Sequence, residues 1–211
     1  MYSKPIQNLI QAFSNLPSVG ERTAERFVFY LLKSGKKDVA ELDLALKNLI
    51  DEIKSCEVCW DFTQHHSDSD ENSAGFTDTS PCPICSNKKR DQSTICVIQE
   101  PQNLQAIEKT SEYNGLYHVL RGTLKPGDDL IPRYLKINEL ITRIKKPEIK
   151  EVILALNPDL NGETTMMFLE NKIKNTNPNI KISRLARGLA MGSDLQYADE
   201  ITLGSALKNR I

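Results

Sequence analysis

Four of the five cysteines in the 211-residue chain lie in two CxxC pairs, Cys56 with Cys59 and Cys82 with Cys85. A CxxC turn lets the backbone fold back so that both thiolates point at one ion. Two such turns together supply the four sulfurs of a tetrahedral Zn²⁺ site. Two disulfides would need an oxidising compartment, and a thioredoxin-type redox pair needs only one CxxC. The spacing therefore predicts one structural zinc ion per chain.

A second group of residues suited to chemistry is a set of carboxylates that follow predicted strands. Glu100 follows the first strand and Asp159 follows the strongest one, and in parallel sheets ligands bind beyond the carboxyl ends of the strands. This arrangement resembles the Toprim domain of topoisomerases and primases, in which such carboxylates hold Mg²⁺. Asn157 stands where those enzymes have an Asp, and its neutral carbonyl is a weaker ligand. Glu163 is either a third ligand or a first-turn acid that the helix dipole favours. The resemblance implies a Toprim scaffold without its catalytic centre.

The elements that position these carboxylates alternate between strands and helices. Apolar runs predict strands at residues 94–98, 117–120, 151–156 and 181–185, with helices between them. We expect a mostly parallel sheet with helices on both faces. Cys96 lies inside the first strand, and we expect it to be inert core.

The first 54 residues predict three short helices. Apolar residues recur with helical spacing at Ile6, Leu9, Ile10 and Phe13, then at Ala24, Phe27, Val28 and Leu31, and finally along one side of residues 39–54. The break between the first two helices reads LPSVG and predicts a tight turn, in which Gly20 can adopt a positive φ.

Helix, LPSVG, helix resembles the helix-hairpin-helix element of DNA repair proteins. Free backbone N–H groups at the start of the second helix can hold a phosphate without reading a base. Arg22 and Arg26 follow at i, i+4, where they are placed to contact neighbouring phosphates. The alternative is that they are solvated arginines paired with Glu21 and Glu25.

Charge is unevenly distributed along a chain whose formal net charge is −1, so any DNA contact must come from a local patch. Between the CxxC pairs, residues 61–78 hold five acidic residues and no Lys or Arg, which predicts a solvated loop pointing away from DNA. The basic run at residues 88–90 is either a DNA contact or an exposed linker. Arg184 and Arg187 are either phosphate contacts or ion pairs at an interface. No apolar run approaches a membrane span, and we expect a cytoplasmic protein.

The order of these parts carries a resemblance over essentially the whole chain. The motifs that carry this resemblance are LPSVG with two arginines, the four cysteines, NPDLNGE and the C-terminal ARGLAMGSDLQYADEITLGSAL. With these motifs, the chain resembles the RecR family of bacterial recombination mediators. The resemblance implies a non-enzymatic protein that forms ring-like tetramers built from dimers and clamps around single- or double-stranded DNA without sequence preference. It also implies that the protein works with RecO and RecF to load RecA on single-stranded DNA at gaps.

The same resemblance implies roles for individual residues. The zinc ligands would be Cys56, Cys59, Cys82 and Cys85, and the DNA contacts would be Arg22 and Arg26. An acidic patch of Glu100, Asp159 and Glu163 would dock a protein partner.

We therefore expect a multidomain α/β protein in four parts: a helix-hairpin-helix region (1–54), a four-cysteine zinc finger with an acidic insert (55–92), a Toprim domain (93–188) and a C-terminal assembly segment (189–211). The alternative function is a Mg²⁺-dependent Toprim nuclease or primase-like enzyme that uses Glu100 and Asp159. A zinc-stabilised adaptor with no DNA role is a third interpretation.

Overall fold

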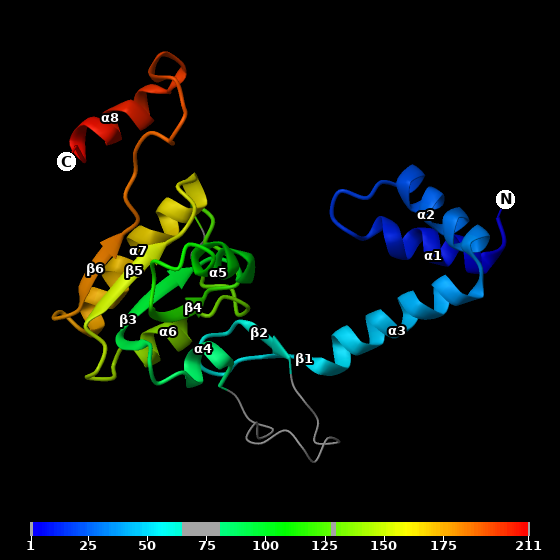
Figure 1. The fold of residues 1–211 in the computed structure, drawn as a ribbon, viewed down its shortest axis with the longest axis horizontal. Coiled ribbons are helices and arrows are strands. Elements are labelled where there is room, and N and C mark those ends of the chain that lie inside the picture. Colours follow the sequence, from blue (N-terminus) through cyan, green and yellow to red (C-terminus); the bar gives the residue numbers. More distant parts are fainter. Residues whose placement is uncertain (1, 65–80, 128–129, 211) are drawn as a thin grey trace. The chain divides into compact units, whose positions relative to one another are not determined.

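The computed structural model describes residues 2–64, 81–127 and 130–210 (Figure 1). These residues fall into two compact units, one of residues 2–53 with Gln64 and one of residues 54–63, 81–127 and 130–210. Most of the predicted acidic loop lies outside the described residues.

The first unit consists of three helices, α1 (Lys4–Ser14), α2 (Glu21–Ser34) and α3 (Lys36–Glu52). Ala24 and Val28 of α2 are buried, and the Phe13 and Phe27 rings meet edge to face with their centroids 5.9 Å apart. Phe27 lies on the apolar side that the sequence predicts for this helix, yet it keeps 37% of its surface exposed among the described residues. The apolar side of α3 is likewise uncovered by the described chain, and Ile50 is 78% exposed.

The turn between α1 and α2 differs from the prediction in the residue that bends it. Ser18 adopts the positive φ, +64°, whereas Gly20 has φ −83°. Gly20 is extended because it caps α2, where its carbonyl accepts a hydrogen bond from the Ala24 amide at 2.9 Å. The Val19 amide closes the turn onto the Leu16 carbonyl at 3.1 Å.

Helix α3 ends two residues earlier than predicted, because the chain becomes extended at Ile53. Strand β1 (Ile53–Ser55) pairs with β2 (Phe62–Gln64) in a small two-stranded sheet. The short helix α4 (Pro83–Ser86) follows in sequence.

The second unit is built on a four-stranded parallel sheet with the strand order β4-β3-β5-β6. Its strands are β3 (Asp91–Ile98), β4 (Gly115–Val119), β5 (Glu151–Ala155) and β6 (Lys181–Arg184). The connecting helices are α5 (Pro101–Glu108), α6 (Ile137–Arg143) and α7 (Leu160–Thr176). The four predicted strands and the parallel arrangement are confirmed.

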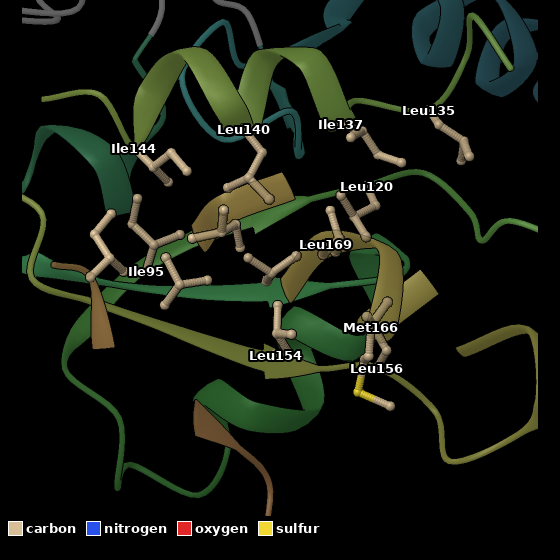
Figure 2. Close-up of a cluster of buried hydrophobic side chains, with 14 of the residues drawn as sticks. Ile95, Leu120, Leu135, Ile137, Leu140, Ile144, Leu154, Leu156, Met166 and Leu169 are labelled. Carbon is tan, nitrogen blue, oxygen red and sulfur yellow. The ribbon is translucent and has the colours of Figure 1, made fainter. Parts of the chain in front are cut away.

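Alternate residues of the sheet pack on opposite faces, as the pleat requires. Ile95 and Leu154 belong to one core with residues of α6 and α7, including Leu140 and Leu169 (Figure 2). Cys96, Ile98, Tyr117 and Val119 belong to a second core with Leu104 of α5. Helices therefore cover both faces, as predicted.

Beyond β6 the chain continues to a 3-10 turn (Leu195–Tyr197) and to α8 (Glu200–Lys208). Its large apolar side chains are exposed, with Met191, Tyr197 and Ile201 each more than four-fifths exposed. No described helix combines the length and the apolar character that crossing a membrane requires.

The turn from β5 into α7 depends on a glycine. The Gly162 amide donates to Asp159 Oδ1 at 2.7 Å, and a Cβ placed on Gly162 would lie 1.9 Å from the Asn157 carbonyl oxygen. No side chain fits at this distance without moving the backbone of the turn.

We expect Gly162→Ala to lower the free energy of unfolding by about 1–3 kcal/mol, as overpacking does. Thermal or urea unfolding measures this decrease. Gly188→Ala is the control, since a Cβ there meets no atom within 4 Å among the described residues and should change little. Equal stability of the two variants would contradict the packing argument.

Candidate functional site

The four predicted cysteines come together in one buried cluster. Cys56 follows β1, Cys59 closes the first turn, and Cys82 and Cys85 lie at the start of α4. The two turns use the same hydrogen bond: the Trp60 amide donates to the Cys56 carbonyl, and the Ser86 amide donates to the Cys82 carbonyl, both at 2.9 Å. This bond folds each CxxC back so that its two sulfurs face the same point.

The sulfur positions fit a tetrahedral metal ion. The four Sγ atoms lie within 4.8 Å of one another, and the Cys59 and Cys82 sulfurs are 3.6 Å apart. Metal–sulfur bonds of about 2.3 Å at tetrahedral angles place sulfurs about 3.8 Å apart, whereas a disulfide requires about 2.05 Å. None of the four cysteines forms a disulfide. This group of side chains can therefore hold a metal ion.

The electrostatics of the cluster also favour a cation. Thiol hydrogen bonds from Cys59, Cys82 and Cys85 hold the pKa of Cys56 far below its ordinary value. The pKa of Cys59 is raised far above its ordinary value, because its thiol is held by the Cys56 sulfur. Ionisation is thus favoured at some of the four thiols and opposed at others, so a divalent cation is what allows all four to ionise.

The backbone of the first turn is hydrogen-bonded to the parallel sheet. The Val119 amide of β4 donates to the Cys59 carbonyl at 2.8 Å. The buried Arg143, at the end of α6, donates through Nη1 to the Tyr117 carbonyl at 2.6 Å and to the Val58 carbonyl at 3.3 Å. One arginine and one backbone hydrogen bond therefore hold the cysteine turn and strand β4 together.

A second set of contacts surrounds Trp60, the only tryptophan of the chain. Arg121 donates to the Trp60 carbonyl at 3.1 Å and to Ser55 Oγ at 2.6 Å, and Lys136 Nζ lies 3.9 Å from the centroid of the Trp60 ring. Trp60 and Arg121 both have positive φ, +66° and +65°. Sequence reasoning missed Arg121, Lys136 and Arg143, and only the position of the lone tryptophan beside Cys59 hinted at this attachment.

The predicted acidic residues mainly serve as helix caps in the structure. Glu100 and Asp159 follow the neighbouring parallel strands β3 and β5. Glu100 caps α5 in a capping box with Asn103, and Asp159 caps α7 through the Gly162 amide. In residues 2–64, 81–127 and 130–210, the cysteines form the only group of three or more potential ligands that could share a metal ion. Glu100, Asp159 and Glu163 do not form such a group.

Glu163 has its own partners within the chain. Arg184 Nη1 lies 3.1 Å from Glu163 Oε2, and Arg187 pairs with the other oxygen of this carboxylate. Arg184 also contacts Glu170 Oε1 at 2.7 Å. The sequence interpretation left the two arginines as phosphate contacts or interface ion pairs, and in the structure both are bound to carboxylates of their own chain.

The start of α2 leaves donors and charges free. Within the described chain, the Glu21 and Arg22 amides have no acceptor, and no ion pair involves Arg22 or Arg26, both of which point at least partly to solvent. Glu25, the expected alternative partner, accepts a hydrogen bond from the Tyr2 hydroxyl. A Cβ on Gly20 would meet nothing within 4 Å among the described residues, so a ligand can approach this backbone closely.

The predicted inert cysteine behaves as core. Cys96 is buried in β3, and burial raises the pKa of its thiol to about 12. It therefore stays protonated near neutral pH and is a poor nucleophile.

Metal content tests the cysteine cluster directly. We expect about one zinc ion per chain, and its removal by a chelator should lower the free energy of unfolding by several kcal/mol. Cys85→Ser should abolish stoichiometric binding, whereas Cys96→Ala, the matched control, should retain it. Stoichiometric zinc in the Cys85→Ser protein would contradict the assignment of the ligands.

The fully buried His118 predicts a pH dependence. Its Nε2 donates to the Lys136 carbonyl at 2.7 Å, its Nδ1 has no partner among the described residues, and burial lowers its pKa to about 3. The unfolded chain therefore binds this proton first, and stability falls as pH drops from about 6.5 towards 3.

We expect His118→Gln to reduce the fall in the free energy of unfolding between pH 6.5 and 5, where one such proton contributes up to about 1.4 kcal/mol per pH unit. Urea unfolding of both zinc-saturated proteins at each pH measures the difference. Identical slopes would show that His118 does not titrate in this way.

Comparison with known proteins agrees with the order of these parts. Sequence profiles match at residues 6–50 (RecR, helix-hairpin-helix), 93–186 (Toprim domain) and 188–211 (RecR, C-terminal). The Recombination protein RecR of Bifidobacterium adolescentis is 44% identical over 209 residues, which cover 99% of this chain and 96% of the relative. Those of Bifidobacterium longum subsp. infantis and Bifidobacterium longum DJO10A are 40% identical with the same coverage. The chain belongs to the RecR family of recombination proteins.

Proposed function

We propose that this chain is a non-enzymatic recombination mediator in DNA repair that binds single- and double-stranded DNA without sequence preference. In this proposal it forms a ring-like tetramer of two dimers, and it acts with RecO and RecF to load RecA at gaps. The observation that carries the proposal is the start of α2 in a member of the RecR family, where two amides and two arginines have no partner in the described chain and are available to a phosphate.

The geometry of α2 supports contact with the DNA backbone rather than with bases. Amides at a helix start and the positive end of the helix dipole attract an anion of any shape. Arg22 and Arg26 lie one turn apart on the same helix. Such contacts position a protein on DNA and carry no sequence information.

The cysteine cluster supports a structural role for zinc. Zn²⁺ accepts four thiolates in a closed site, and no position is then left for a water or a substrate. The ion would be held by Cys56, Cys59, Cys82 and Cys85. The hydrogen bonds from Arg143 and from the Val119 amide would fix the cysteine turn, and with it the ion, relative to the sheet. We therefore assign zinc no part in chemistry.

The carboxyl end of the sheet supports a docking role more than catalysis. Glu100 and Asp159 cap helices, Glu163 is bound by two arginines, and Asn157 supplies no charge. A Mg²⁺ site needs several converging anionic oxygens. We propose that this patch contacts a protein partner, with Glu100 and Asp159 supplying most of its negative charge.

Exposed apolar side chains support self-assembly. Large apolar side chains on two helices are more than half exposed: Leu46, Leu49 and Ile50 on α3, and Ile201 and Leu207 on α8. Apolar surface of this kind marks sites of protein association. We propose that these helices make the contacts of a cytoplasmic homo-oligomer, and we retain the four-part division at residues 54, 92 and 188.

DNA binding at different salt concentrations tests the proposal. We expect Arg22→Gln with Arg26→Gln to weaken binding about equally for all sequences. The slope of log K against log salt should fall by about 0.9 for each phosphate that the variant no longer neutralises on duplex DNA, and by about 0.7 on single strands.

The control is Arg22→Lys with Arg26→Lys, which keeps both charges and should keep most of the slope. Fluorescence anisotropy with labelled oligonucleotides gives both quantities. Unchanged binding by the glutamine variant would remove the hairpin from the DNA site.

A further inference from the structure

Lysines gather at the amino end of the parallel sheet, opposite to the edge that carries Glu100 and Asp159. They lie shortly before β3 and β5, at the start of β6, just after α6 and in the last turn of α7, and all are exposed. We call this set the lysine edge: Lys88, Lys89, Lys145, Lys146, Lys150, Lys174 and Lys181.

The backbone fixes these lysines relative to one another. The Lys150 amide donates to the Ser93 carbonyl at 2.8 Å, and the Lys181 amide donates to the Lys150 carbonyl at 2.9 Å. The Asn177 side chain joins the end of α7 to the Ile144 carbonyl at the end of α6, at 3.4 Å. Figure 1 shows the turns that precede β5 and β6 at the same end of the sheet.

Positive charge exceeds negative charge at this end. The seven lysines face three carboxylates, Asp91, Glu148 and Glu151, and Lys109 and Glu112 in the turn before β4 cancel each other, which leaves four positive charges in excess. The Asp91 carboxylate is occupied by Ser93 and Thr94, and Glu151 pairs with Lys181 at 3.1 Å. Among the described residues, the other six lysines form no ion pair.

Favourable interaction with helix dipoles explains the positions of only some of these lysines. Lysines near helix C-termini stabilise the dipole, which explains Lys145 and Lys146 after α6 and Lys174 in the last turn of α7. Lys150 and Lys181 are at the starts of strands, where no helix dipole favours them. Arg90, by contrast, is bound to Glu108 and to the Gly115 carbonyl and stabilises the fold.

We propose that the lysine edge is a second phosphate-binding surface, which contacts the backbone of the DNA bound by this protein. Lysines act as mobile point charges that hold phosphates regardless of base. The starts of β3 and β6 are two strand spacings apart, about 10 Å, and duplex DNA carries one charge per about 1.7 Å of its axis. Residues 144–150 and 176–181 contain no aromatic side chain, so base stacking is excluded there.

The inference rests on the proposed function, because the ligand is the same DNA. The test is a triple variant, Lys145→Gln, Lys146→Gln and Lys150→Gln, in the full-length zinc-loaded protein. We expect duplex affinity to fall by roughly tenfold or more and the salt slope to fall by about 0.9 for each phosphate that is no longer neutralised. Circular dichroism and the melting temperature confirm that the variant is folded.

Two controls separate location from charge. Arginine at the same three positions keeps the charges and should keep the affinity. Glutamine at Lys36, Lys47 and Lys208 makes the same change in net charge on α3 and α8, away from this edge of the sheet, and should have a much smaller effect.

The outcomes distinguish this inference from the proposed function. A triple variant that binds like the wild-type chain, or is weakened no more than the charge-matched control, overturns the lysine edge as a DNA surface and favours an acidic protein as its partner. If Arg22 and Arg26 are needed while the lysines are not, only this inference fails. If the lysines are needed while the arginines are not, the lysine edge stands and the hairpin site fails.

Discussion

The hydrogen bond from the Val119 amide to the Cys59 carbonyl joins the four-cysteine cluster to the sheet. Strand β4 is an edge strand, and an edge strand exposes backbone donors that can recruit another chain. The cysteine turn satisfies this donor, and Arg143 binds carbonyls on both sides of the same contact. A metal ion held by the four cysteines would therefore also stabilise the outer edge of the sheet, because it would add four bonds to the turn that covers this edge.

Backbone strain is concentrated at this contact. Trp60 and Arg121 both adopt the left-handed conformation, which costs about 1–3 kcal/mol for each residue. The cost is offset locally: the strained Arg121 donates to the carbonyl of the strained Trp60, and Lys136 covers the Trp60 ring. Strain of this kind persists only where the surroundings determine the conformation, so the turn and the loop after β4 are positioned by each other.

Sequence patterns of a few residues predicted those features of the structure that depend on neighbouring residues in the chain. The cysteine spacing, the four strands and the parallel sheet follow from periods of a few residues, and all appear in the structure. The attachment of Trp60 to Arg121 and Lys136 joins residues 61 and 76 positions apart, and no periodicity encodes such a pair. The same limit explains Glu163, whose arginine partners lie more than 20 residues away, and Ser18, which takes the bend because Gly20 is used as a helix cap.

The distribution of charge reconciles a net charge of −1 with a DNA-binding role. Parallel strands bring all amino ends to one edge and all carboxyl ends to the other, so residues at equivalent positions in successive units gather at the same edge. In this chain lysines gather at the amino edge and carboxylates at the carboxyl edge, where arginines neutralise Glu163. Salt screens exposed charges beyond about 10 Å, so DNA near the amino edge responds to the local lysines rather than to the distant carboxylates. A parallel sheet can thus separate a nucleic-acid surface from a protein surface without any change in net charge.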